Sequence, residues 1–278
     1  MQTVLEIITK SAEWLGTKGV EKPRLDAELL LAHVLKCKRL DLYLRHDDVV
    51  RDPALSLLRE VVRRRGKREP LAYILGETEF FNLKLKCDAR ALVPRPETEE
   101  LVELVTELLT TPPATLLDLG TGTGALALAL AKHWPQCIAV AVDTSGEALA
   151  LATENAKANA LETRVNLRLS DWFSAVPERF PLIVSNPPYL TEEELISAQP
   201  EVREFEPHSA LTAPNAGLAD LLRIIAEARE HLEPGGLLAM ETGIAQHSAL
   251  AAAASAGYSR WESRKDLAKR ERFFLAWA

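Results

Sequence analysis

The segment Thr115-Leu-Leu-Asp-Leu-Gly-Thr-Gly-Thr-Gly124 decides the fold of this sequence. It starts as a short apolar strand, ends in a loop with three glycines, and continues into a helix expected over residues 125–132. Glycines let the backbone turn tightly and let a ligand approach closer than any Cβ would permit. The N-terminus of the following helix favours polar or anionic groups. This order of strand, glycine-rich loop and helix is typical of nucleotide-binding sheets.

The alternation of strands and helices continues to the C-terminus. Further strands are expected over residues 137–142, 165–169, 182–185, 237–241, 259–265 and 272–277, and further helices over 146–159, 218–232 and 245–256. This pattern predicts an α/β fold with a Rossmann-like, doubly wound parallel sheet that helices cover on both faces. The last two strands must pair antiparallel, because the connection over residues 266–271 is too short for a crossover.

The first 75 residues carry apolar side chains at helical spacing and predict a small all-α domain. One of its helices is expected over residues 53–67, with Asp52 as the cap and Pro53 in the first helical position. A basic run, Arg63-Arg-Arg-Gly-Lys-Arg68, closes this helix. The run is either a solvated last turn or a contact for an acidic or RNA-like partner.

Residues 76–96 form a linker between this domain and the α/β domain of residues 97–278. Apolar and polar positions alternate along it: Phe81, Leu83, Leu85 and Cys87 are separated by Asn82, Lys84 and Lys86. A period of two predicts a β-hairpin bridge, and Asp88-Ala89-Arg90 is its expected turn.

Composition excludes several classes of protein. The chain has 278 residues, is 47% hydrophobic and has a formal net charge of −7, which argues against an enzyme that binds bulk nucleic acid. Cys37, Cys87 and Cys137 lie far apart and fit a reducing compartment better than a zinc site or disulfides. With no basic N-terminal region and no long uncharged apolar run, a soluble cytoplasmic protein is expected, and no membrane partner.

The glycine loop alone leaves the nucleotide undecided. Asp143 ends the strand that follows, where an acidic side chain can accept hydrogen bonds from both hydroxyls of a ribose. However, Gly120, Gly122 and Ala125 also satisfy G-x-G-x-x-A, the fingerprint of dinucleotide-binding proteins.

Two further features favour a methyl donor, S-adenosylmethionine. Asp118 lies inside the strand end, where a carboxylate can hold the ammonium of a methionine moiety but would repel a pyrophosphate. The next strand ends in Ser170-Asp171-Trp172, a polar and aromatic group suited to the edge and the face of adenine.

The strand at residues 182–185 ends in the most specific motif of the chain, Asn186-Pro187-Pro188-Tyr189. An amide or exocyclic amine nitrogen has a delocalised lone pair, so it is a poor nucleophile, and a general base helps it little. Two acceptors that hold its N–H groups help more, and the Asn186 side-chain oxygen and the Pro187 carbonyl can supply them. Tyr189 offers a flat face for a planar substrate group. The motif predicts in-line methyl transfer driven by positioning and electrostatics.

The two motifs together resemble class I methyltransferases that act on amide or exocyclic nitrogen. A narrower resemblance spans essentially the whole chain. The segments Tyr73-Ile-Leu-Gly76, Leu92-Val-Pro-Arg-Pro-Glu-Thr-Glu99, Phe205-Glu-Pro207 and Ala210-Leu211 are similar to the release factor glutamine methyltransferases. That family has a small N-terminal helical domain for substrate recognition ahead of its catalytic domain.

This resemblance implies the substrate, which is the glutamine of the Gly-Gly-Gln motif in class I peptide chain release factors, so that methylation modulates translation termination. It also implies the site residues. The donor would contact Asp118, Gly120, Thr121, Gly122, Thr123, Gly124, Asp143, Asp171, Trp172 and Asn186, and the glutamine would contact Asn186, Pro187, Pro188 and Tyr189. Histidines and carboxylates form no cluster in the sequence, so no metal is expected. The oligomeric state stays open, with a monomer as the default.

Other functions remain as alternatives. A DNA adenine methyltransferase uses a similar Asn-Pro-Pro-Tyr turn but needs a target-recognition domain and a basic cleft for a flipped base. A ribosomal-protein glutamine methyltransferase is closer, and is expected to differ at residues 95–99. A dehydrogenase fits the glycine pattern alone, with no catalytic residue that we can assign. A non-enzymatic adaptor would not need three acidic strand ends together with the proline turn.

Overall fold

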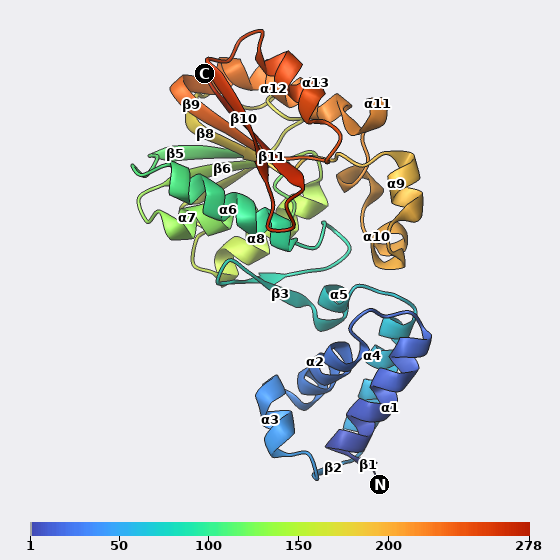
Figure 1. Cartoon of the computed structure of the whole chain (residues 1–278). Coiled ribbons are helices and arrows are strands. Elements are labelled where there is room, and N and C mark those ends of the chain that lie inside the picture. Colours follow the sequence, from blue (N-terminus) through green and yellow to red (C-terminus); the bar gives the residue numbers. More distant parts are fainter. Residues whose placement is uncertain (1) are drawn as a thin grey trace. The chain divides into compact units, whose positions relative to one another are not determined.

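The computed structural model of the chain describes residues 2–278 and divides into two compact units. The first unit consists of Met1–Gly76 with Gln199–Phe205, and the second consists of Glu77–Ala198 with Glu206–Ala278. The short segment at residues 199–205 therefore packs with the N-terminal helices, although it follows the Asn-Pro-Pro-Tyr turn in the sequence. Figure 1 shows the elements of both units in sequence colours.

The first unit is helical, as the apolar spacing predicts. Its elements are β1 (Gln2–Thr3), α1 (Val4–Thr17), α2 (Pro23–Leu35), α3 (Arg39–Leu44), β2 (Val49–Val50), α4 (Ala54–Gly66), α5 (Leu71–Leu75) and, from the later segment, α10 (Pro200–Phe205). Leu15, Leu30 and Leu31 are fully buried in its core. The expected cap of α4 is wrong in detail. Pro53 occupies the cap position, and the Asp52 carboxylate instead accepts a hydrogen bond from the Ser56 hydroxyl at 2.8 Å.

The basic run at residues 63–68 is largely neutralised inside this unit. Arg65 is only 7% exposed, and its guanidinium lies 2.6 Å from Asp26 and 2.7 Å from Glu201. Arg68 forms a second ion pair with Glu201 at 2.6 Å, and Arg64 pairs with Glu69 at 2.5 Å. Neither expectation for the run holds for Arg65 and Arg68, because both hold α10 against the N-terminal helices.

The second unit contains the predicted doubly wound sheet. Its strands are β5 (Thr115–Leu119), β6 (Ile138–Asp143), β7 (Val165–Leu169), β8 (Phe180–Ser185), β9 (Leu232–Glu241), β10 (Arg260–Lys265) and β11 (Glu271–Trp277). They form a seven-stranded sheet in the order β10-β11-β9-β8-β5-β6-β7. The pairs within β9-β8-β5-β6-β7 are parallel, whereas β11 is antiparallel to both of its neighbours. The predicted antiparallel last strand is confirmed.

Helices cover both faces of this sheet (Figure 1). One face packs against α6 (Pro96–Leu108), α7 (Ala125–His133) and α8 (Gly146–Ala158), and the other packs against α12 (Ala219–His231) and α13 (His247–Ala254). Successive residues of β8 divide between the two cores, as a strand buried on both faces requires: Leu182 and Val184 belong to one core and Ile183 to the other. Within residues 2–278, no helix combines the length and apolar composition that crossing a membrane requires.

The sequence did not predict the helix α6 or the four short elements between β8 and α12. Of these four, α10 belongs to the first unit and the other three belong to the second. These three are α9 (Glu192–Ser197), the 3-10 helix η1 (His208–Ala210) and α11 (Pro214–Gly217). The predicted hairpin is present as β3 (Glu77–Phe80) and β4 (Leu83–Lys86), but its turn was misplaced. Phe81 and Asn82 make the turn, with φ values of 44° and 60°, as a tight two-residue hairpin connection requires. Asp88 and Arg90 instead form a local ion pair beyond the hairpin.

The side chain of Asn155 in α8 joins the hairpin to the glycine loop. Its Oδ1 accepts from Lys86 N at 2.6 Å, and its Nδ2 donates to Lys86 O at 3.1 Å and to Thr123 O at 2.9 Å. Asn155 is fully buried. We therefore predict that Asn155→Ala lowers the free energy of unfolding by about 1–3 kcal/mol, because buried backbone groups lose their partners. Urea unfolding measures this, and an unchanged midpoint would contradict it. Asn159→Ala, at a more exposed amide, is the control.

Candidate functional site

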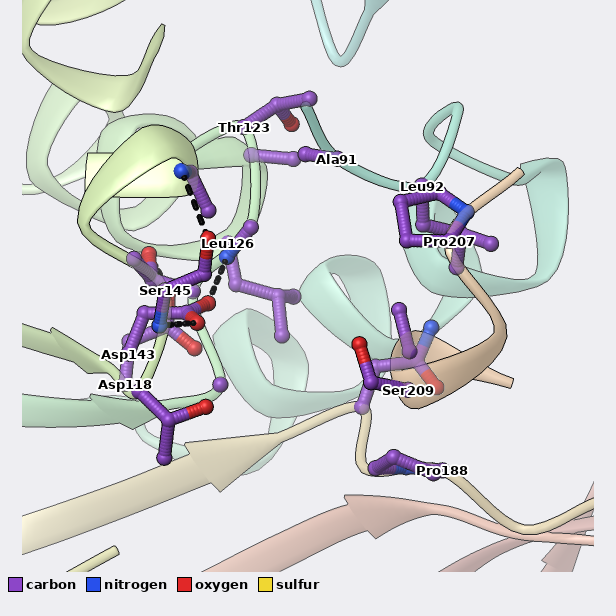
Figure 2. A pocket seen from close by; sticks show the side chains of 18 of the residues that line it. Ala91, Leu92, Asp118, Thr123, Leu126, Asp143, Ser145, Pro188, Pro207 and Ser209 are labelled. Carbon is purple, nitrogen blue, oxygen red and sulfur yellow. Dashed lines mark hydrogen bonds between the residues drawn. The ribbon is translucent and has the colours of Figure 1, made fainter. Parts of the chain in front are cut away.

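A cavity of about 310 Å³ lies in the second unit at the carboxyl ends of the parallel strands, where ligands bind in sheets of this kind. Figure 2 shows Asp118 and Asp143 on one side of it and Pro188 and Ser209 on the other. Most of the predicted site residues line it: Asp118, Gly120, Thr121, Gly122, Thr123, Asp143, Asp171, Trp172, Asn186 and Pro188. Among the residues described, Gly124, Pro187 and Tyr189 are absent from the lining.

The glycine loop connects β5 to α7 with three left-handed glycines. Gly120 has a φ of +69°, and a Cβ there would lie 3.4 Å from the Trp172 ring. Gly124 has a φ of +85°, and a Cβ there would meet the Leu128 side chain at 3.0 Å. The absence of a side chain at Gly124 therefore allows the start of α7 to pack closely. The absence of one at Gly120 leaves room for the Trp172 ring in the cavity wall.

Asp118 lies at the bottom of the cavity and is fully buried. Its Oδ2 accepts hydrogen bonds from the Thr121 hydroxyl at 2.6 Å and from Ala127 N at 3.2 Å. Its Oδ1 has no hydrogen-bond partner among residues 2–278. Burial raises the pKa of this carboxyl to about 7. A buried acceptor without a partner fits a ligand that brings a positively charged donor.

Asp143 ends β6 and is held by the backbone. Its Oδ2 accepts from Gly122 N and its Oδ1 accepts from Ser145 N, both at 2.9 Å. A carboxylate has about four lone-pair sites, so each oxygen can still accept one further hydrogen bond. The side chain is thus oriented in advance for two donors of a ligand, such as neighbouring hydroxyls.

Asp171 and Trp172, which follow β7, also line the cavity. The Trp172 indole donates to the Asp220 carboxylate at 3.3 Å, while Asp171 forms an ion pair with Arg223 at 2.8 Å. All four side chains line the cavity. Asp220 and Arg223 come from α12, a helix with no recognisable site motif in its sequence.

The Asn-Pro-Pro-Tyr turn follows β8 directly. Asn186 lines the cavity, and its Nδ2 donates to the Thr98 hydroxyl of α6 at 3.0 Å. Pro188 also faces the cavity, whereas Pro187 is buried behind it. The turn therefore presents one side-chain amide and one proline ring to the cavity.

The Tyr189 side chain lies outside the cavity lining and is held by Glu241 and Arg272. Its hydroxyl donates to Glu241 Oε1 at 2.9 Å, and the Arg272 guanidinium lies 5.7 Å from its ring centroid and donates to its oxygen at 3.3 Å. Burial, followed by the charge of Glu241, raises the pKa of Tyr189 well above its ordinary value. The phenol therefore stays neutral and acts as a fixed donor.

The backbone of the turn is also fixed. Gln246 Nε2 donates to Tyr189 O at 2.8 Å and to Gly217 O at 3.0 Å, and Gln246 Oε1 accepts from Gly243 N at 2.8 Å. Gly217 has a φ of +75°, and a Cβ there would lie 2.0 Å from Tyr189 O. No side chain larger than hydrogen fits at that position.

Sequence reasoning missed four residues that hold the turn: Thr98, Glu241, Gln246 and Arg272. One signal was present, because Glu241 is an acidic residue at the carboxyl end of a predicted strand, like Asp118 and Asp143. The other three carry no local signal. In the part of the chain that the structure describes, histidines, cysteines and carboxylates form no group of three or more that could hold a metal.

Two family models match parts of this chain. Residues 6–76 match the family model described as the PrmC N-terminal domain, and residues 99–201 match the methyltransferase small domain. The release factor glutamine methyltransferase of Escherichia coli (strain K12) is 41% identical, with 92% of each chain covered. That of Cereibacter sphaeroides is 42% identical, with 94% of each chain covered. Among solved structures, the T. thermophilus 16S rRNA N2 G1207 methyltransferase in complex with AdoMet and guanosine has a TM-score of 0.52 at 20% identity, covering 72% of this chain and 49% of its own. This similarity shows that the two proteins share a fold.

The buried acid Asp118 predicts a pH dependence of stability. Its pKa rises from 3.8 to about 7 in the folded protein, so the folded state holds this proton more tightly than the unfolded chain does. Its contribution to stability is complete below the unfolded value and is lost as the pH rises through about 7. Asp118→Asn has no such proton, so its free energy of unfolding should decline less across this window. Parallel urea titrations of both proteins test this, and identical pH profiles would contradict it.

Proposed function

Because the chain belongs to the release factor glutamine methyltransferase family, we propose that it methylates release factors on glutamine. It transfers a methyl group from S-adenosylmethionine to the side-chain amide nitrogen, N5, of the glutamine in the Gly-Gly-Gln motif of class I peptide chain release factors. The observation that carries the proposal is the orientation of Asn186, whose Nδ2 is bound to Thr98 while the residue lines the cavity. Its Oδ1 is thereby available to accept an N–H group of a substrate amide.

S-adenosylmethionine fits the chemistry of the cavity. Asp143 would hold the ribose hydroxyls, and Gly120–Gly124 with Asp118 would hold the methionine moiety, whose ammonium matches the unpartnered Asp118 Oδ1. Asp171 and Trp172 would hold adenine. When bound, this donor supplies an electrophilic methyl group on a sulfonium. No metal takes part in the proposed reaction.

The residues of the turn would orient the acceptor nitrogen. A glutamine amide is planar, and its lone pair is delocalised into the carbonyl. The Asn186 oxygen would accept one of its two N–H groups, and the Pro187 carbonyl, whose residue is not in the cavity lining of this structure, would accept the other. Pro188 and Tyr189 shape the turn beside it. This arrangement turns the nitrogen lone pair toward the methyl group and stabilises the charge that develops on the nitrogen. The chain contributes positioning and electrostatics. As the bond between nitrogen and the methyl carbon forms, the bond between that carbon and the sulfonium sulfur breaks, S-adenosylhomocysteine leaves as the neutral thioether, and the methylated nitrogen then loses one proton to solvent.

The helical domain and the α/β domain would have different roles. Residues 1–75 would recognise the release factor, residues 76–96 would link, and residues 97–278 would bind the donor and carry out the transfer. Contact of the substrate with two regions raises the effective concentration of the flexible Gly-Gly-Gln loop at the catalytic turn. The partner is a protein, and no stable complex with nucleic acid is required.

Asn186→Ala tests the role of the turn. We expect turnover of a release factor to fall by about 100-fold or more, because the lost acceptor acts most strongly as the lone pair is freed. Some donor affinity should fall as well, so turnover is measured at saturating S-adenosylmethionine. Near-normal turnover under those conditions would contradict the role. Asn166→Ala, on the outer strand β7, is the matched control.

The methylated position tests the substrate. After incubation with labelled donor, mass spectrometry should find a single methyl group on the glutamine of the Gly-Gly-Gln motif. A release factor with Gln→Asn in the motif should stay unmodified, because the shorter side chain cannot place its nitrogen in line with the sulfonium. A methyl group on a nucleic-acid base or a ribosomal protein would overturn the proposed substrate.

A further inference from the structure

A chain of hydrogen bonds leads from the catalytic turn to a carboxylate that does not touch the cavity. Asn186 Nδ2 donates to Thr98 Oγ1 at 3.0 Å, and Thr98 Oγ1 donates to Glu241 Oε2 at 2.7 Å. The other oxygen of Glu241 accepts from the Tyr189 hydroxyl at 2.9 Å. Glu241 is 1% exposed and lies at the end of β9, beside β8. Both functional side chains of the turn therefore depend on one buried acid.

We propose that Glu241 is a positioning residue for amide methylation: through Thr98 it fixes which atom of the Asn186 amide faces the substrate, and through Tyr189 it fixes the ring. This proposal rests on the proposed function and adds the residue that orients its acceptors.

The direction of the hydrogen bonds follows from elementary donor and acceptor rules. A carboxylate can only accept, so the single proton of the Thr98 hydroxyl points at Glu241. The Thr98 oxygen is then left with lone pairs alone and can only accept from Asn186. The amide group of Asn186 that faces Thr98 must therefore be its NH2 group. Its oxygen, the acceptor that a glutamine N–H needs, is turned the other way.

The Tyr189 branch obeys the same rule. Its hydroxyl has one proton, which it gives to Glu241, and its oxygen accepts from Arg272 Nη1 at 3.3 Å. Arg272 also donates to Thr242 O at 2.9 Å, so its guanidinium is fixed on β11. Its positive charge offsets part of the cost of burying the Glu241 carboxylate. A neutral side chain at position 241 would remove this nearby carboxylate and leave the guanidinium with Asp266, 3.7 Å from its Nε, as its ion-pair partner.

Thr98 allows a test with closely matched variants. Thr98→Val keeps the shape and removes the hydroxyl, whereas Thr98→Ser keeps the hydroxyl and removes a methyl group. We expect kcat for release factor methylation to fall by about 10- to 100-fold in Thr98→Val, the loss typical of small misplacements of a reacting group. Thr98→Ser should retain most of the activity. The affinity for S-adenosylmethionine, measured by calorimetry, should fall no further in Thr98→Val than it does in Asn186→Ala, and should stay near that of the wild type in Thr98→Ser.

Glu241→Gln tests the carboxylate itself. Its amide brings a donor where Glu241 has only acceptors, so either Thr98 or Tyr189 loses its acceptor, and kcat should fall as in Thr98→Val. The double variant Thr98→Val/Glu241→Gln should lose much less than the product of the two single losses, because both act through Asn186. Thr242→Val removes a buried hydroxyl next to Glu241 and serves as the control for general destabilisation.

A spectroscopic readout separates this proposal from the proposed function. The side-chain NH2 signals of Asn186, identified in a ¹H–¹⁵N spectrum by their loss in Asn186→Asp, should show slowed exchange with water. Thr98→Val and Glu241→Gln should shift these signals and speed their exchange, and Thr242→Val should not. This result needs no substrate, so it stands even if the methylated protein is another one. Unchanged Asn186 signals in folded Thr98→Val, wild-type kcat in that variant, or an equal kcat loss in Thr242→Val would overturn the proposal.

Discussion

The parallel pairing of β5, β8 and β9 is the constraint on which the site depends. Leu119 pairs with Ser185, and Ser185 pairs with Met240, so the three strands end at the same level. The residues that follow these positions are the start of the glycine loop, Asn186 and Glu241. A slip of one residue in either pairing would turn alternate side chains to the opposite face and separate these groups. The apolar cores on both faces of the sheet hold this register, and so they also hold the site.

The same close packing buries two carboxyl groups, and burying the charged form of such a group costs free energy. Asp118 and Glu241 are each at most 1% exposed, and burial raises the pKa of both. Acids in such places rarely stabilise a fold more than apolar residues of similar size would. Their hydrogen bonds suggest different uses. Both oxygens of Glu241 are bound by protein hydroxyls, which suits a residue that orients its neighbours, whereas Asp118 Oδ1 has no partner within residues 2–278, which suits a residue that receives a ligand.

The sheet could be predicted from the sequence because its signals are local. Apolar runs, glycines and helical spacing located its strands and the covering helices α7, α8, α12 and α13, although α6 was missed, and the short last connection implied the antiparallel strand. Prediction failed where tertiary contacts decide the conformation. The hairpin turns at Phe81 and Asn82, whose left-handed backbone has no glycine to announce it. The elements between Thr191 and Gly217 are short and depend on distant partners, such as Gln246 bound to the Tyr189 carbonyl.

The site shows the same division between local and distant information. Asp118, Asp143 and Asn186 could be predicted because each lies near, at or directly after the end of its own strand, beside a recognisable motif. Thr98 lies 88 residues before its partner Asn186, and Glu241 lies 52 residues after its partner Tyr189, so motif spacing could not connect them. The order of strands could have done so. In a doubly wound sheet, the strand that runs parallel beside β8 ends at the same edge of the sheet as β8. An acidic residue at that end therefore faces the catalytic turn. For this fold, the ends of neighbouring strands are therefore the places in a sequence to search for residues that orient catalytic groups without touching the substrate.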